Sequence, residues 1–142
     1  MEQIFRRKIY QKLLEWKSTE NGRTAILVEG ARRVGKSTIV ELFAKQEYES
    51  YILIDFNKAG KNVIELWNDL MDIDRIFLLL QQIYNVTLYE RKSVIIFDEV
   101  QKCPLARQAI KYLVQDGRYD YIETGSLISI HKNTKDITIP SE

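Results

Sequence analysis

Short apolar runs alternate along this chain with segments whose apolar residues recur every three or four positions. Four of the runs are predicted to be strands, over residues 25–28, 51–56, 94–97 and 119–124. The first run is continuously apolar, which is typical of a strand covered on both faces. The pattern therefore predicts a sheet buried between two layers of helices.

The segments between the runs have helical spacing. An opening helix is expected over about residues 4–17, because Phe5, Ile9 and Leu13 fall on one face. Further helices are expected over residues 37–46, over 63–85, where the pattern is weak up to residue 70 and strong from 73, and from Pro104 to a stop at Gly117.

Strands that alternate with helices predict a parallel sheet with helices on both faces. The chain has 142 residues, which fits one domain over residues 1–142. The polar tail from residue 131 offers only residues 137–139 as another short strand. We expect an α/β three-layer sandwich whose mainly parallel sheet has four to five strands.

Composition and charge exclude several classes of protein. The net charge of +1 gives no clear signal for nucleic-acid binding, and no apolar run approaches the roughly 20 residues of a membrane span. The N-terminus lacks the apolar segment of a secretory leader. The single cysteine, Cys103, requires no oxidising compartment and is expected to fill space. We expect a cytoplasmic protein without a membrane partner.

A glycine-rich loop after the first strand carries the clearest chemical signal. Residues 30–37 fit the phosphate-binding pattern G-x-x-x-x-G-K-[ST] without a mismatch: Gly30, Ala31, Arg32, Arg33, Val34, Gly35, Lys36 and Ser37. A strand before the loop and a helix after it supply backbone N–H groups and a positive helix end for an anion. Lys36 is expected on the β- and γ-phosphates and Ser37 on Mg²⁺. The alternative is a turn punctuated by glycines.

A second motif follows the third strand, where four apolar residues precede Asp98 and Glu99. Asp98 would hold Mg²⁺, and Glu99 would orient and deprotonate the water that attacks the γ-phosphate. Alone these are ordinary loop residues, but the upstream loop favours a nucleotide site. A strand over residues 51–56 lies between the two motifs in sequence, and a glutamate directly follows the aspartate. Both features predict the P-loop ATPase subclass with an additional strand and a catalytic glutamate. The guanine-reading motif of a GTPase and the lid of a small-molecule kinase are not found.

The end of the fourth strand adds hydroxyl groups at the same predicted edge of the sheet. Parallel sheets bind ligands outside the carboxyl ends of their strands. Thr124 and Ser126 are therefore candidate sensors of the γ-phosphate or the attacking water, with Ser126 preferred, and a plain exit turn is the alternative. Asp55 is more readily a turn residue than a Mg²⁺ ligand. Gln101 is a less favoured candidate for orienting water near Glu99.

Three stretches together, residues 30–37, 95–101 and 122–126, resemble the AAA-superfamily ATPases of bacteria and archaea that carry an uncharacterised nuclease-like C-terminal region. The resemblance implies phosphate binding by residues 30–38, which adds Thr38 to the loop. It also implies Mg²⁺ binding by Ser37 and Asp98, catalysis by Glu99 and sensing at Ser126 or Thr124.

Members of the family that this chain resembles are considerably longer. The fifth strand, a second sensor arginine and the C-terminal region are accordingly expected to be missing here. We expect a truncated C-terminus, impaired activity, and a need for self-association or for the missing C-terminal domain.

These inferences predict an enzyme that binds ATP and hydrolyses it with Mg²⁺. The first alternative is an ATP-dependent conformational switch or scaffold with negligible hydrolysis. The second is a truncated fragment that binds nucleotide weakly.

Overall fold

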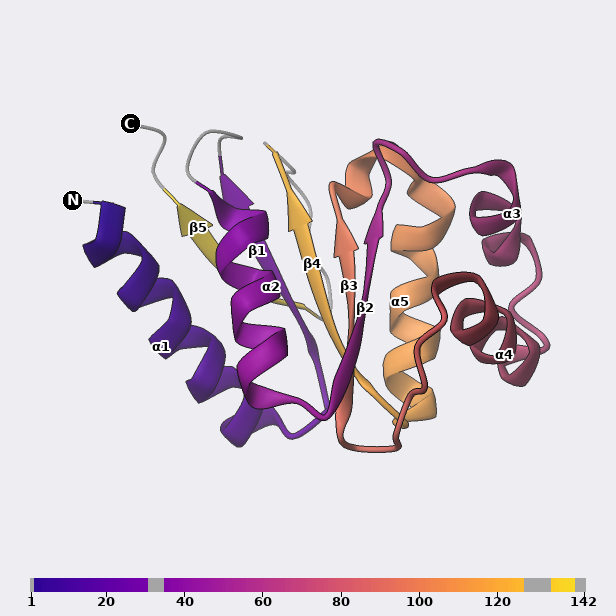
Figure 1. Cartoon of the computed structure of the whole chain (residues 1–142), viewed down its shortest axis with the longest axis horizontal. Coiled ribbons are helices and arrows are strands. Elements are labelled where there is room, and N and C mark those ends of the chain that lie inside the picture. The colour runs from indigo at the N-terminus through magenta and orange to yellow at the C-terminus, as the bar shows by residue number, and fades with distance from the viewer. Residues whose placement is uncertain (1, 31–34, 127–133, 140–142) are drawn as a thin grey trace.

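The computed structural model describes residues 2–30, 35–126 and 134–139 (Figure 1). Its α-helices are α1 (Glu2–Glu20), α2 (Lys36–Glu47), α3 (Lys61–Ile64), α4 (Ile73–Tyr84) and α5 (Pro104–Asp116). Its strands are β1 (Ala25–Gly30), β2 (Ser50–Asp55), β3 (Ser93–Asp98), β4 (Asp120–Gly125) and β5 (Thr134–Ile139). Two short 3-10 helices, η2 (Glu65–Asn68) and η3 (Val100–Lys102), complete the described elements.

The five strands form one parallel sheet in the order β2-β3-β4-β1-β5. The four strands expected from the sequence are confirmed, with ends shifted by one or two residues. β4 lies between β1 and β3, so it separates the strand before the glycine-rich loop from the strand before Asp98 and Glu99. β2, the strand that lies between the two motifs in sequence, is at the edge of the sheet.

The expectation that the fifth strand is missing is wrong. β5 pairs in parallel with β1 along its whole length, from Thr134 opposite Ala25 to Ile139 opposite Gly30. The sequence pattern allowed a strand only over residues 137–139. Because β5 pairs with β1 through backbone groups at the edge of the sheet, the run did not need to be apolar to form a strand.

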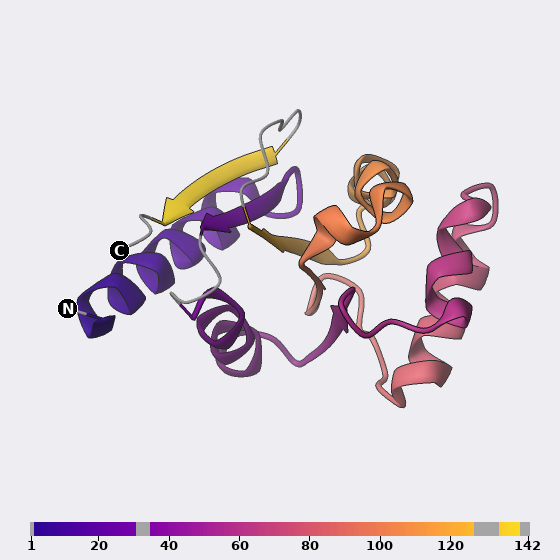
Figure 2. The same cartoon turned by 90° about the horizontal axis from the view of Figure 1, so that it is seen from above.

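Helices cover both faces of the sheet, which confirms the expected three layers (Figure 2). On one face α1 and α2 pack against the sheet, with Leu13 and Phe43 completely buried. On the other face α4 and α5 pack against it, with Leu80 and Leu113 completely buried. These two cores fix the sheet, and with it the positions of the strand ends.

The helical region expected over residues 63–85 is broken into α3, η2 and α4. The break coincides with the weak part of the pattern, and α4 begins where the pattern becomes strong. The Asp72 carboxylate accepts a hydrogen bond from the N–H of Arg75 at 3.1 Å, so Asp72 caps the N-terminus of α4. Asn85 ends α4 in the left-handed conformation, with φ 55°.

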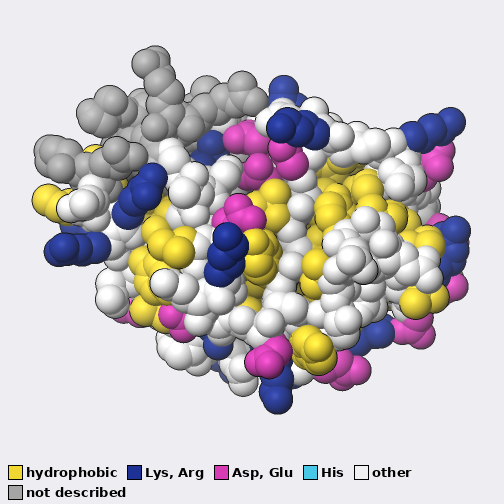
Figure 3. Space-filling view, viewed as in Figure 1, with side chains coloured by type: hydrophobic (Ala, Val, Ile, Leu, Met, Phe, Trp, Pro, Cys, Tyr) yellow, Lys and Arg dark blue, Asp and Glu magenta, His cyan; other side chains and the backbone are white. Residues whose placement is uncertain are grey.

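The surface carries charges of both signs. In the face shown in Figure 3, acidic and basic side chains are interspersed among apolar and neutral ones. In the part of the chain that the structure describes, no helix is long and apolar enough to cross a bilayer. Cys103 is buried in the core beside α5, which agrees with the space-filling role expected for it.

Candidate functional site

The carboxyl ends of four parallel strands bring the motif residues to one edge of the sheet. β1 ends at Gly30, β2 at Asp55, β3 at Asp98 and β4 at Gly125. In register, Asp55 lies opposite Asp98 on the neighbouring strand. The edge expected from the sequence is therefore formed, and residues more than 60 positions apart in the chain meet there.

The glycine-rich loop leads directly into α2. Gly35 has φ 72° and ψ 29°, a left-handed conformation that glycine adopts without steric cost, and it precedes the first residue of the helix. Among the described residues, α2 has no side-chain cap and no acidic residue in its first turn. No side chain of the described N-cap or first turn therefore accepts hydrogen bonds from the N–H groups at this helix end. Residues Ala31, Arg32, Arg33 and Val34 lie outside the described residues.

Lys36 joins the loop to the second motif. Its Nζ donates to Glu99 Oε2 at 3.1 Å and to Ser126 Oγ at 3.2 Å. The two charged side chains are almost completely buried, with 2% and 6% exposed. A buried ammonium group is tolerated only when it is paired. The ion pair therefore holds Lys36 and Glu99, 63 positions apart in sequence, in one cluster.

Asp98 is held by hydroxyl groups from two other elements. Ser37 Oγ donates to Asp98 Oδ1 at 2.6 Å, and Thr124 Oγ1 donates to the same oxygen at 2.6 Å. Thr124 also accepts the backbone N–H of Glu99 at 2.9 Å and is completely buried. Thr124 thus fixes both acidic residues, whereas Ser126 lies against Lys36 and Glu99. Of the two sensor candidates, Ser126 is the better placed to meet a ligand.

The role of Thr124 on Asp98 could not be read from the sequence. The register pairs Phe97 with Glu123, which puts the next residue of each strand, Asp98 and Thr124, side by side. Neighbouring positions of this kind depend on β4 lying next to β3, and strand order leaves no short motif in a sequence. The signal that the sequence does contain is a hydroxyl residue at the predicted strand end.

Glu99 follows β3 in a left-handed conformation, with φ 55°. Its Oε1 accepts hydrogen bonds from Gln101 Nε2 at 2.8 Å and from Ser126 Oγ at 3.2 Å. Burial by itself raises the pKa of the Glu99 carboxyl, but the hydrogen bonds from Gln101 and Lys36 outweigh it and lower that pKa below its ordinary value. The side chain is therefore held as a carboxylate.

Two other expected residues lie near the edge without joining the cluster. Asp55 accepts the backbone N–H of Asn57 at 2.9 Å, so it acts as the turn residue that was the favoured interpretation. Thr38 is exposed on the first turn of α2. Among the described residues, no group of three or more His, Cys, Asp or Glu side chains could hold a metal ion by itself. Ser37 Oγ and Asp98 Oδ1 are a pair of adjacent oxygen atoms at this edge.

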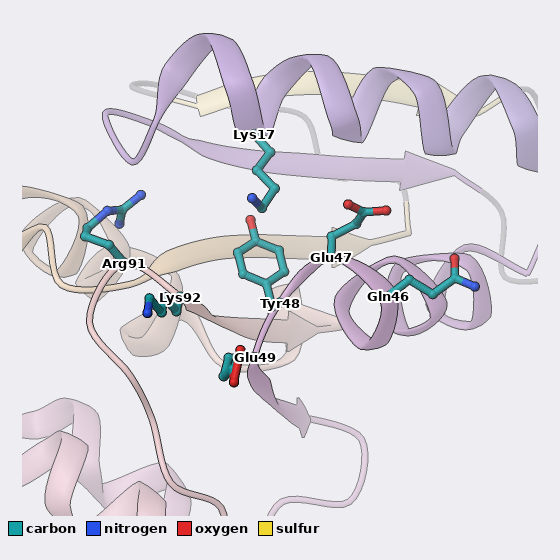
Figure 4. A pocket seen from close by; sticks show the side chains of 7 residues that line it. All are labelled: Lys17, Gln46, Glu47, Tyr48, Glu49, Arg91 and Lys92. Carbon is teal, nitrogen blue, oxygen red and sulfur yellow. The ribbon is translucent and has the colours of Figure 1, made fainter.

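A second polar region lies at the opposite edge, where the strands begin (Figure 4). A cavity of about 280 Å³ is lined there by Lys17, Gln46, Glu47, Tyr48, Glu49, Arg91 and Lys92. Beside it, Tyr48 donates to Asp120 Oδ2, and Arg91 Nη2 lies 2.6 Å from Asp120 Oδ1. We call Tyr48, Arg91 and Asp120 the amino-edge network. It contains none of the motif residues.

Comparisons with known proteins identify a family for this chain. Residues 22–138 match the family model described as AAA domain. No curated protein is similar enough to count as a match. Solved structures that resemble this chain include that of C. elegans PCH-2, at 17% sequence identity and a TM-score of 0.46. That similarity covers 94% of this chain and 39% of the PCH-2 chain.

Proposed function

This chain belongs to the AAA domain family, and we propose that the carboxyl edge of its sheet binds ATP together with Mg²⁺ and hydrolyses the γ-phosphate. One observation carries the proposal: Ser37 Oγ lies 2.6 Å from Asp98 Oδ1, although the two residues are 61 positions apart. A loop motif and a strand-end motif that were recognised separately are thereby joined at the two side chains expected to share the metal ion.

Nucleotide binding is supported by the start of α2. A helix N-terminus without an acidic residue attracts phosphate through its N–H groups and its positive dipole end. Lys36 is on the first turn of that helix, and its ammonium group reaches the other half of the site. Phosphate oxygens would replace Glu99 Oε2 as its partner, so Lys36 would stay paired when nucleotide binds.

The ligand atoms at Ser37 and Asp98 fit Mg²⁺. This ion prefers oxygen ligands and is held by one or two protein groups together with waters and substrate phosphates, so a larger cluster of protein ligands is not needed. Thr124 supports the pair from behind, because its hydroxyl holds the same Asp98 oxygen that Ser37 contacts. When bound, the ion would neutralise charge on the β- and γ-phosphates.

In the hydrolytic step, Glu99 would act as the general base. It would take a proton from water as the water oxygen bonds to the γ-phosphorus, while the bond from that phosphorus to the bridging oxygen breaks and its electron pair leaves with ADP. Lys36 would stabilise the negative charge on the transferred group. Ser126, which contacts both Lys36 and Glu99, would sense the γ-phosphate between them.

A second candidate function is favoured by a specific contact. Both oxygens of Glu99 accept hydrogen bonds from protein donors in this conformation, Oε1 from Gln101 and Oε2 from Lys36. If ATP did not draw Lys36 away from Oε2, the ion pair would keep Glu99 a weak base, and the domain would bind ATP as a conformational switch with negligible hydrolysis.

ATP affinity and Mg²⁺-dependent phosphate release separate these functions when measured for wild type, Lys36→Ala and Glu99→Gln. The hydrolase is supported if Lys36→Ala loses binding while Glu99→Gln keeps binding and loses turnover. Binding without turnover in wild type would favour the switch. A wild-type chain that binds no ATP would refute both.

A further inference from the structure

Gln101 lies next to Glu99 on a short turn that is anchored in the core. The turn η3 begins after Glu99 and closes with a hydrogen bond from the N–H of Lys102 to the Glu99 carbonyl at 3.1 Å. Val100 and Cys103 anchor this turn in the core. From it, Gln101 Nε2 donates to Glu99 Oε1 at 2.8 Å, a short contact for a neutral donor on a carboxylate. The position of Gln101 is therefore set by buried neighbours and not by a ligand.

The donors around Glu99 divide its two oxygens unequally. Oε1 has the shorter contact to Ser126, at 3.2 Å against 3.4 Å for Oε2, in addition to its contact with Gln101. Oε2 has the contact with Lys36. Under the proposed function Lys36 moves to the phosphates, whereas the amide of Gln101 has no reason to leave. Nucleotide binding would therefore free one oxygen and leave the other held.

We propose that Gln101 is a positioning residue for ATP hydrolysis: it holds Glu99 by Oε1, so that Oε2, the oxygen released by Lys36, takes the proton from the attacking water. This proposal rests on the proposed function and identifies Gln101 as the residue that orients the general base, Glu99. The proton passes from water to Oε2, the water oxygen bonds to the γ-phosphorus, and the electron pair of the broken P–O bond leaves with ADP.

The chemistry of an amide suits this task. It donates a hydrogen bond without a charge, so it fixes the carboxylate without forming the ion pair that lysine or arginine would form there. Gln101 Oε1 is buried and has no hydrogen-bond partner among the described residues. In the described part of the chain, the hydrogen bond to Glu99 is thus the contact that holds the amide, and the amide oxygen accepts no hydrogen bond from a protein donor.

Steady-state kinetics of Gln101→Met test the proposal. Methionine keeps the length of the side chain and removes the donor, so we expect kcat to fall about tenfold, with ATP affinity within about twofold of wild type. Gln101→Glu should lower kcat further than Gln101→Met, because it places a second carboxylate beside Glu99. The matched control is Gln108→Met, the same change at an exposed position of α5, which should leave kcat unchanged.

The Glu99→Gln background shows whether Gln101 acts through Glu99. There the base is absent, so Gln101→Met should change the residual turnover by less than about twofold. An equal fall in both backgrounds would overturn the proposal, because Gln101 would then act on water or on the fold. A raised KM with unchanged kcat would also overturn it.

A stability measurement separates failure of this inference from failure of the proposed function. In urea unfolding without nucleotide, Glu99→Met and Gln101→Met should be non-additive by about tenfold in the unfolding equilibrium constant. Additive effects would overturn the inference whether or not the protein is active. Non-additive effects in a wild type that releases no phosphate would refute the hydrolase and the role of Gln101 in it, while confirming the contact.

Discussion

The two edges of the sheet both contain buried polar side chains, but they balance charge differently. At the amino edge, the Asp120 carboxylate is paired with the Arg91 guanidinium and accepts a hydrogen bond from Tyr48. At the carboxyl edge, the Lys36 ammonium group is paired with Glu99, while the Asp98 carboxyl group accepts hydrogen bonds from the hydroxyls of Ser37 and Thr124. Among the described residues of these two clusters, the first has one cation for its one carboxyl group, and the second has one cation for two carboxyl groups.

Under the proposed function, the difference separates an edge that contributes to stability from an edge that takes a ligand. Buried charge that is not balanced lowers stability, so it is retained where a ligand supplies the balance. A divalent cation beside Asp98 would supply it at the carboxyl edge. Substitutions should therefore reduce stability at the amino edge and reduce activity at the carboxyl edge.

The largest effect is expected from Glu99→Gln. Removal of a general base costs roughly 10²–10⁴ in rate, and we expect kcat to fall about 10³-fold while ATP still binds. Phosphate release under saturating ATP measures the change. The matched control at the other edge is Glu49→Gln, an exposed carboxylate that lines the amino-edge cavity and should leave kcat unchanged. Equal losses in the two variants would remove the distinction between the edges.

The next largest effect is expected from Asp120→Ala. This change leaves Arg91 and the Tyr48 hydroxyl without their shared acceptor, and we expect the free energy of unfolding to fall by about 2–3 kcal/mol. Urea unfolding measures it, and ATP affinity should stay within about twofold under conditions where the variant is folded. A variant of normal stability that no longer binds ATP would reverse the roles of the edges.

Tyr48→Phe should have a smaller effect at the same network. It removes one hydrogen bond to Asp120 and keeps the ring, which lies edge-on to Phe43 with centroids 5.9 Å apart. We expect the free energy of unfolding, measured in urea, to fall by about 1 kcal/mol, and phosphate release to stay unchanged. No change in stability would show that the hydroxyl is equally well solvated in the unfolded chain.

The two edges should also respond to opposite ends of the pH range. Burial, and then the nearby charge of Asp120, raises the pKa of Tyr48. Its contribution to stability is thus present below the unfolded tyrosine pKa of about 10 and is lost as pH rises above it. The pKa of Glu99 is lowered below 4.5, because hydrogen bonds from Gln101 and Lys36 outweigh the effect of burial, so its contribution is lost as pH falls below that value.

Urea midpoints measured across the pH range test this pair of responses. Tyr48→Phe should lose less stability than wild type above pH 10, and Glu99→Gln should lose less below pH 4.5. If Tyr48→Phe follows the wild-type curve at high pH, or Glu99→Gln follows it at low pH, the substituted group does not contribute the pH-dependent stability expected at that edge.

Much of the fold could be predicted from local patterns. Apolar runs identified β1 to β3, the mixed segment over residues 119–124 identified β4, and Pro104 and Gly117 marked the ends of α5. β5 was foreseen at most over residues 137–139, because an edge strand needs only backbone pairing and four of the six residues over 134–139 are polar. The helix expected from residue 63 failed where its apolar spacing was weak.

The residues of the candidate site could be predicted where a sequence motif specifies them. Contacts that depend on the order of the strands in the sheet could not be predicted. The spacing of the loop and of Asp98 and Glu99 placed the candidate residues on strand ends, and the parallel sheet brings them to one edge. The position of β4 between β1 and β3, by contrast, leaves no mark in the sequence. The contact of Thr124 with Asp98, and the pairing of Lys36 with Glu99, depend on that order.

The central claim, that the carboxyl edge is a site for ATP with Mg²⁺, is tested most directly by calorimetric titration of ATP with and without Mg²⁺. Wild type and Ser37→Ala should be compared, because Ser37 Oγ is the atom that joins the loop to Asp98. We predict that Mg²⁺ strengthens ATP binding to wild type at least about tenfold and strengthens binding to Ser37→Ala much less. Equal strengthening in the two proteins, or no effect of Mg²⁺ on wild type, would contradict the claim.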